Sequence, residues 1–119
     1  MGLWMPLSRA HGKTPREPWQ YGDMALKEVK KWINFRHRLV PYLYHAACQS
    51  HQSGIPMIRP LVMEYPKDPI AKIQNLSYML GDALLISPGF DRDEYELYLP
   101  EGRWQDIESK EVLHVPAQL

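Results

Sequence analysis

Residues 23–63 read DMALKEVKKWINFRHRLVPYLYHAACQSHQSGIPMIRPLVM, and this stretch decides the fold class. In its first half, apolar residues recur at the three- and four-residue spacing of an amphipathic helix. They are Leu26, Val29, Trp32, Ile33 and Val40. Its last part, residues 57–63, is almost continuously apolar, which is typical of a parallel strand covered on both faces. We therefore predict an α/β fold.

Residues with strong backbone preferences mark the ends of these elements. Asp23 is expected to be the N-cap of the first helix, because a carboxylate there can accept a backbone hydrogen bond. Pro41 should end or kink that helix near Leu39 and then begin a second helix, for which Gly54 is a stop signal. Pro60 cannot donate to a strand ladder, so the paired part of the strand lies before it or after it.

The flanking segments show weaker patterns. Residues 1–22 contain prolines and glycines that interrupt every apolar run, so we predict a short strand or extended segment followed by a loop. After the turn signals that follow the strand, residues 73–80 are expected to form a short helix closed by Gly81.

Beyond residue 82 the pattern changes to short strands. The predicted elements are strands at 83–87, 95–99 and 112–115, with a turn at 100–104. Because helices and a buried strand give way to short strands here, we predict a domain boundary, with one domain at 1–81 and a second at 82–119.

Composition bounds the possible partners. The 14 Lys and Arg residues balance 14 Asp and Glu residues in a chain of 119, so net charge favours neither a nucleic acid nor an anionic membrane. No stretch approaches the roughly 20 apolar residues of a membrane span. We therefore predict no nucleic acid and no membrane partner.

Cys48 is the single cysteine, which excludes an intramolecular disulfide. The sequence therefore does not determine the cellular compartment, and it does not determine the oligomeric state.

The common signatures of metal and cofactor sites are missing. The five histidines never fall into an HExxH pattern or a cysteine-paired ligand spacing. The chain also has no nucleophile elbow, phosphate loop or dinucleotide fingerprint. We therefore predict no metal and no cofactor.

Two aspartates that follow glycine, Asp23 and Asp82, are candidates for chemistry. Glycosidases need two carboxylates that flank the scissile bond, but sequence spacing cannot show that these two face each other. The alternative is structural, because an aspartate after glycine often caps a helix or closes a turn.

The loop at residues 8–19, SRAHGKTPREPW, is chemically richer. It concentrates guanidinium, imidazole and indole groups, which can respectively bind a carboxylate, donate to a sugar hydroxyl and cover the apolar face of a pyranose ring. The alternative for Arg16, Glu17 and Trp19 is a loop pinned by an Arg–Glu pair and a buried Trp.

Five blocks, read in order, carry a family resemblance. They are PLSRAHG, TPREPW, RHRLVPYLYHAACQSHQSGIPMIRPLVMEYP, YMLGDALLISPGF and ELYLPEGRWQDI. Together they resemble the late part of glycoside hydrolase family 31, the α-glucosidase and α-xylosidase family, over roughly residues 2–107. The resemblance implies the terminal portion of a TIM (β/α)8 barrel followed by the first strands of an all-β sandwich domain.

The same resemblance implies which residues bind sugar. The family motif is P-aromatic-x-R-[small, Asn or Asp]-H, which Pro6, Arg9, Ala10 and His11 match, while Leu7 replaces the aromatic residue. The family histidine hydrogen-bonds the sugar at the cleaved bond, so His11 is the expected substrate-binding residue and Arg9 its orienting neighbour. In a barrel of this kind the site is built by loops after the strands.

The resemblance also implies a retaining enzyme that hydrolyses terminal α-linked xylose or glucose in oligosaccharides through a covalent glycosyl-enzyme. The family's two catalytic aspartates lie upstream of the histidine motif and are not in this chain. Gly22-Asp23-Met24-Ala25 imitates the nucleophile motif, but Leu26 stands where Glu is required. We therefore assign no catalytic residue, interpret Asp23 as a helix cap and expect the chain alone to be inactive.

Two other functions stay open. SRAHG followed by TPREPW is closer to the bacterial α-xylosidase-like branch, but an α-glucosidase or a 4-α-glucosyltransferase of the same family is the first alternative. The second is a non-catalytic carbohydrate-binding or structural module.

Overall fold

A computed structural model describes residues 2–89 and 97–116 of the chain. The fold divides into two compact units. The first comprises Met1–Met57 with Leu80–Leu84, and the second comprises Ile58–Met79 with Leu85–Leu119. Among the described residues, no helix combines the length and the apolar character that crossing a membrane requires.

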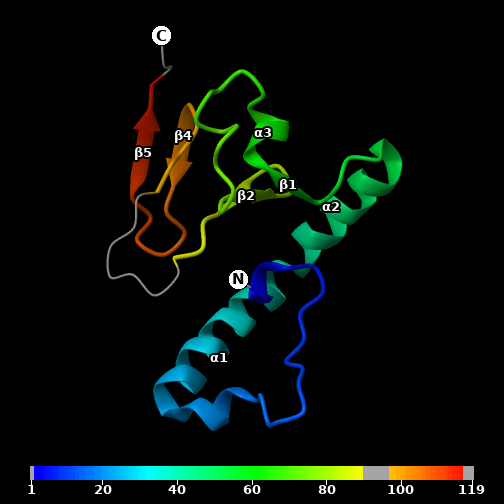
Figure 1. The fold of residues 1–119 in the computed structure, drawn as a ribbon, viewed down its shortest axis with the longest axis vertical. Helices are drawn as coiled ribbons and strands as arrows, with labels where there is room; N and C mark the ends of the chain where they lie inside the picture. The colour runs from blue at the N-terminus through cyan, green and yellow to red at the C-terminus, as the bar shows by residue number, and fades with distance from the viewer. Residues whose placement is uncertain (1, 90–96, 117–119) are drawn as a thin grey trace. The chain divides into compact units, whose positions relative to one another are not determined.

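The first unit is built on two consecutive helices. They are α1 (Gly22–Arg38) and α2 (Val40–Ser53), preceded by the 3-10 helices η1 (Gly2–Trp4) and η2 (Pro18–Tyr21). Figure 1 shows η1 near the C-terminal end of α1, from which the chain runs back to the beginning of that helix. The two predicted helices are thus confirmed. Within residues 1–22 we expected a short strand or extended segment and then a loop; the described residues 2–22 contain the loop but begin with η1 and form no strand.

Local backbone chemistry explains the junctions. Leu39 lies between the helices, and its N–H donates to Arg36 O at 3.0 Å. Pro41 lies in the first turn of α2, where a missing N–H costs no helical hydrogen bond. Gly54 ends α2 in the left-handed conformation, with φ of 75°, and its N–H donates to Ser50 O at 2.9 Å. These predicted signals are confirmed.

The prediction that Asp23 is the N-cap of the first helix is wrong. Helix α1 already begins at Gly22, Tyr21 occupies the N-cap position, and no side chain caps the first turn. Asp23 lies inside that turn, where its negative charge is favourable beside the positive end of the helix dipole.

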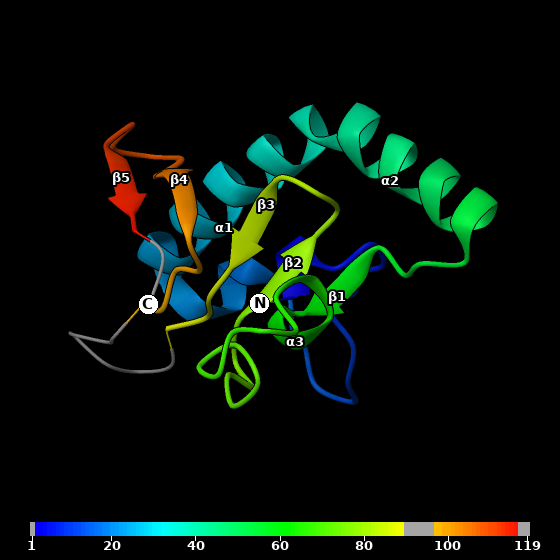
Figure 2. The ribbon, with the colours of Figure 1, turned by 90° about the horizontal axis from the view of Figure 1, so that it is seen from above.

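The second unit is mainly β-structure. Its elements are β1 (Ile58–Pro60), α3 (Leu61–Glu64), β2 (Tyr78–Leu80), β3 (Leu84–Ile86), β4 (Gly102–Gln105) and β5 (Val112–Val115). The last residue of β2, Leu80, and the first residue of β3, Leu84, are counted with the first unit. Strands β1, β2 and β3 form one sheet in that order, as Figure 2 shows. Strands β4 and β5 form an antiparallel pair in which Trp104 lies opposite Leu113.

Two predictions from apolar runs need correction. The strand expected at 57–63 ends at Pro60, whose extended backbone leads into helix α3. The helix expected at 73–80 is wrong, because Tyr78–Leu80 is strand β2 with all three residues buried. A short apolar run does not distinguish a buried strand from a buried helical segment, and here burial on both faces selects the strand.

The later strands are partly confirmed. Strands β3 and β5 lie within the residues predicted for them. The turn expected at 100–104 is wrong in its second half, because Gly102–Gln105 is strand β4. In the strand expected at 95–99, residues 95 and 96 lie outside the described residues, and 97–99 form no strand.

The core of the second unit surrounds Leu61, Ala71 and Met79, all buried. Asp68 organises the turn beside it, since its Oδ1 accepts hydrogen bonds from the N–H groups of Ile70 at 2.8 Å and Ala71 at 3.1 Å. The Tyr98 hydroxyl donates to the other carboxylate oxygen. This hydrogen bond and those from the backbone lower the pKa of Asp68, while desolvation and the Asp68 charge raise the pKa of Tyr98 to about 12.

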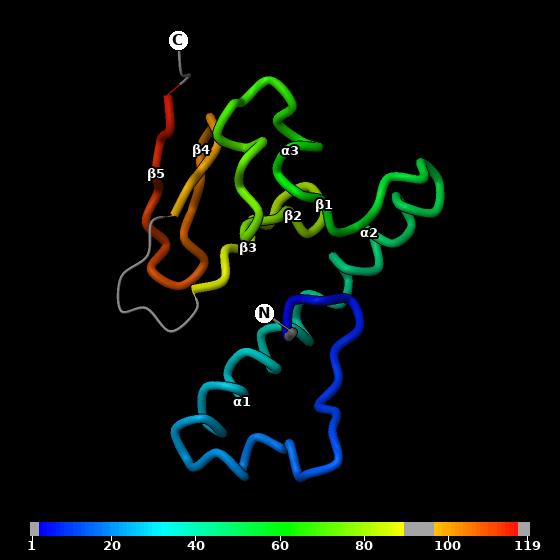
Figure 3. Tube along the Cα trace, in the orientation of Figure 1, coloured from blue at the N-terminus to red at the C-terminus, as the bar shows by residue number. Residues whose placement is uncertain are grey.

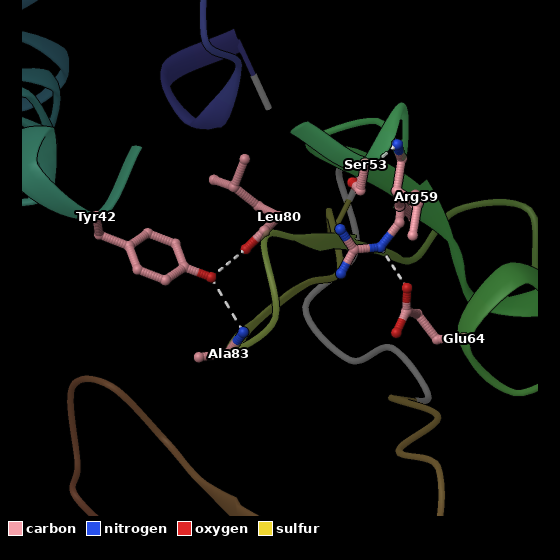
Figure 4. A network of polar contacts seen from close by, with 7 residues as sticks. Tyr42, Ser53, Arg59, Glu64, Leu80 and Ala83 are labelled. Atoms are coloured by element: carbon pink, nitrogen blue, oxygen red, sulfur yellow. Dashed lines mark hydrogen bonds and ion pairs between the residues drawn. The ribbon is translucent and has the colours of Figure 1, made fainter. Parts of the chain in front are cut away.

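Two further polar contacts, one from half-buried Tyr42 and one from buried Arg59, appear in Figure 4. In the first unit, the Tyr42 hydroxyl donates to Leu80 O at 2.6 Å and accepts from the Ala83 N–H at 3.0 Å. In the second, the guanidinium of buried Arg59 pairs with Glu64 of α3.

We predict that Tyr98→Phe lowers the free energy of unfolding by about 1 kcal/mol, because Asp68 loses a partly buried hydrogen bond. A depressed folded-state pKa contributes stability that is present above the unfolded-state pKa and is lost as pH falls through the folded-state value. The variant should therefore lose less stability than the parent when the pH is lowered from about 7 to about 3.

Urea unfolding at the two pH values measures both the loss of stability and its pH dependence. Tyr44→Phe, at an exposed tyrosine, is the matched control, and equal effects of the two changes would contradict the prediction.

We further predict that Gly81→Ala destabilises the protein more than Gly54→Ala. Both glycines have positive φ, 59° and 75°, so both changes strain the backbone. At Gly81 an added Cβ would also collide with the Tyr42 hydroxyl and ring, whereas at Gly54 it would meet open space. We expect a cost of about 1 kcal/mol at Gly54 and at least about twice that at Gly81. Urea midpoints of the two variants make the comparison, and a reversed order would refute it.

Candidate functional site

The predicted substrate-binding residues lie on one exposed loop. Residues 5–17 join η1 to η2, and Arg9 and His11 are both exposed there, two positions apart. Figure 3 traces this segment as the blue part of the tube leading to α1. The structure therefore places both side chains where a ligand from solvent can reach them.

An aromatic cluster holds the segment that precedes this loop. Trp4 of η1 packs against Trp32 and Phe35 of α1, with ring centroids 5.5 and 5.7 Å away. Trp32 and Phe35 are three residues apart, so they share one face of the helix, and their own rings lie 6.1 Å apart. The tilted and edge-on arrangements are those that aromatic quadrupoles favour.

Arg36 adds polar contacts from the same helix. Its Nη1 donates to Leu3 O at 2.9 Å and to Met5 O at 2.5 Å, and its Nη2 donates to Pro6 O at 2.7 Å. The guanidinium thus gathers three backbone carbonyl groups of the N-terminal segment. This contact joins residues 30 to 33 positions apart, so no local sequence pattern could reveal it.

The second end of the loop is fixed by η2. Gln20 N–H donates to Glu17 O at 3.0 Å, and Pro18 begins this short helix. Within the loop, the Arg16 side chain lies so close to Gly12 that a Cβ there would approach its Nε to 2.7 Å. Any side chain at Gly12 would have to displace Arg16.

The structure modifies the alternative interpretation of this loop. Trp19 is 62 % exposed, so the buried Trp expected in a purely structural loop is wrong. Glu17 is half-buried, and its Oε2 has no hydrogen-bond partner within residues 2–89 and 97–116. The indole is therefore available as a flat apolar surface near the base of the loop.

The other two candidate residues lie on other elements. Asp23 is exposed in the first turn of α1, and Asp82 is exposed in the turn between β2 and β3. The described part of the chain contains no group of three or more His, Cys, Asp or Glu side chains that could hold a metal ion.

The second unit contains a hollow that sequence patterns did not indicate. Its volume is about 400 Å³, and Tyr65, Asp68, Tyr98 and Glu101 are among the residues that line it. These residues come from separate turns and loops, so only the folded chain brings them together.

Comparison with known families matches both halves of the chain. Residues 1–46 match the glycosyl hydrolases family 31 TIM-barrel domain. Residues 54–118 match the glycosyl hydrolase family 31 C-terminal domain, which is more than half of the chain.

Individual relatives agree with this match. The chain is 36 % identical over 126 aligned residues to human neutral alpha-glucosidase AB, covering 100 % of this chain and 13 % of that protein. It is 33 % identical to an alpha-xylosidase of Lactiplantibacillus pentosus, covering 97 % of this chain and 15 % of the relative. Its fold matches the Flavobacterium johnsoniae GH31 dextranase, solved with glucose, with a TM-score of 0.86, 34 % identity and coverage of 97 % of this chain and 16 % of that one.

The chain thus spans only 8–15 % of the length of the curated relatives it matches. The match nevertheless extends over nearly all of its residues, and it keeps the order of the two family domains. This chain therefore belongs to glycoside hydrolase family 31 and comprises the end of the TIM-barrel domain followed by C-terminal-domain structure.

Proposed function

We propose that the whole protein is a retaining α-glycosidase that removes terminal α-linked xylose or glucose from oligosaccharides, and that this chain supplies substrate-binding residues. The observation that carries the proposal is the exposed loop with His11 and Arg9, held at Pro6 by Arg36 and followed by η2. Support comes from relatives named as alpha-glucosidases and an alpha-xylosidase, and from a dextranase structure complexed with glucose.

The loop has the chemistry that sugar binding requires. The His11 imidazole can donate to one sugar hydroxyl and, when neutral, accept from another. Arg9 is two residues away and can orient the imidazole or the loop backbone, because guanidinium N–H groups have a fixed geometry. Trp19 offers an apolar face to a pyranose ring. A neutral oligosaccharide also needs no electrostatic steering, which fits the balanced charge.

The proposed reaction requires two carboxylates that the rest of the protein would supply. One attacks the anomeric carbon as the leaving group takes a proton from the other, and water then cleaves the glycosyl ester. His11 and Arg9 would position the sugar for both steps, and this chain contributes no catalytic residue.

The identity of the sugar is the finer part of the proposal. Xylose lacks the hydroxymethyl group of glucose, and the SRAHG and TPREPW blocks lean toward α-xylosidase. The relatives include glucose-acting and xylose-acting enzymes at 36 % and 33 % identity, so this lean needs a direct assay. An α-glucosidase or 4-α-glucosyltransferase is the alternative within the family, and a non-catalytic carbohydrate-binding module is the alternative outside enzymes.

We also propose that residues 1–81 are the C-terminal part of the barrel and that residues 82–119 form the first strands of a β-sandwich domain. The antiparallel pair of β4 and β5 supports this architecture, because sandwich domains are built from such pairs. The boundary itself stays a prediction.

In the whole enzyme, His11→Ala should reduce kcat/KM by about 10- to 100-fold, the cost of one lost hydrogen bond to substrate, without changing the unfolding midpoint. Rates on aryl α-xyloside and aryl α-glucoside measure the loss and identify the preferred sugar. His51→Ala, at an exposed histidine on α2, is the control. An unchanged rate in His11→Ala would remove His11 from the site.

The 119-residue chain alone should show no turnover of either aryl glycoside, because the catalytic carboxylate pair is proposed to lie outside it. The measurement is release of the aryl group by the purified chain. Turnover that disappears in Asp23→Asn would contradict the assignment of Asp23 to helix α1 alone.

A further inference from the structure

Arg36 is a half-buried side chain in the last turn of α1, and its three hydrogen bonds all go to the backbone that leads into the His11 loop. We propose that Arg36 is a positioning residue that sets the place of His11 and Arg9 by holding this backbone. The inference rests on the proposed function of His11, and it adds a residue that acts on substrate only through the loop.

The place of the three acceptors carries the inference. Leu3 O and Met5 O belong to the end of η1 and its exit, and Pro6 O belongs to the first residue of PLSRAHG. From Pro6 to Arg16 every residue is exposed. Pro6 is therefore the last backbone position that Arg36 binds before Arg9 and His11. A displacement of the backbone at Pro6 would move both of these side chains.

The aromatic cluster alone does not fix that position. Trp4, Trp32 and Phe35 hold η1 on α1, but their contacts end at Trp4, two residues before Pro6. Apolar ring contacts of this kind constrain direction only weakly, whereas hydrogen bonds to carbonyl groups select direction and distance. Arg36 adds that selection at Met5 and Pro6.

The geometry calls for arginine in particular. Nη1 serves two of the acceptors and Nη2 the third, so the contact uses the planar fork of the guanidinium. A lysine ammonium keeps the charge but offers its donors from a single atom on a flexible stem. Arg36→Lys should thus leave the helix intact and loosen the backbone at Pro6.

The experiment combines a loop readout with kinetics in the whole enzyme. Limited trypsin digestion follows cleavage after Arg9 and Lys13, which lie in the exposed loop. Steady-state rates on the preferred aryl α-glycoside are measured for Arg36→Lys, His11→Ala and the double variant. Arg38→Lys, an exposed arginine two residues further along α1, is the matched control.

We expect Arg36→Lys to speed loop cleavage by about tenfold and to lower kcat/KM by about tenfold, since displacement of a binding group by about 1 Å is costly. The double variant should be no slower than His11→Ala, because Arg36 acts through His11 and the two losses are not additive. Arg38→Lys should match the parent in both measurements.

Several results would overturn the inference. Unchanged loop cleavage in Arg36→Lys would show that Arg36 does not hold the loop. Faster cleavage with unchanged kinetics, or losses that add in the double variant, would show that its role is separate from His11. If Arg36→Lys does not fold, Arg36→Gln, which keeps a planar donor group, undergoes the same comparison.

Failure of the proposed function gives a different result. A His11→Ala enzyme with normal rates would refute the role of His11, and with it the effect of Arg36 on catalysis. Loop cleavage in Arg36→Lys would still decide whether the guanidinium holds the backbone at Pro6.

Discussion

The contact on which the site depends is that between the guanidinium of Arg36 and three carbonyl groups of the N-terminal segment. That segment has little regular structure, so its backbone polar groups need partners from elsewhere. Helix α1 supplies them from one face, with Trp32 and Phe35 binding η1 through aromatic contacts and Arg36 binding the chain that follows. The helix thereby converts an irregular segment into a defined support for a loop.

The second unit reaches order by a different route. Its hydrophobic core is small, and polar side chains fix the turns around it. Asp68 accepts hydrogen bonds from two backbone N–H groups and from the Tyr98 hydroxyl, and Arg59 pairs with Glu64 at the end of α3. Because these groups are removed from water in part, each of them is costly to leave without its partner. These polar contacts therefore fix the conformation of the turns, as backbone hydrogen bonds fix that of the strands.

The sequence predicts the first unit better than the second for a physical reason. Helices α1 and α2 have long periodic patterns, and Pro41 and Gly54 act locally, so their effects can be inferred without knowing the fold. Strand β2 is a three-residue apolar segment whose state depends on burial by distant neighbours, and a helix was predicted there. The site divides in the same way. A motif indicated His11 and Arg9, whereas the role of Arg36 depends on contacts between residues 30 to 33 positions apart.

The exposure of residues 6–16 has an evolutionary consequence. Both anchors, Arg36 on one side and η2 on the other, lie outside this stretch, so most substitutions inside it leave the folding core untouched. Gly12, covered by Arg16, is the position where that freedom is restricted. With the sugar-binding role proposed for this loop, selection could alter sugar preference there while the framework persists, and new specificities within the family could arise in this segment.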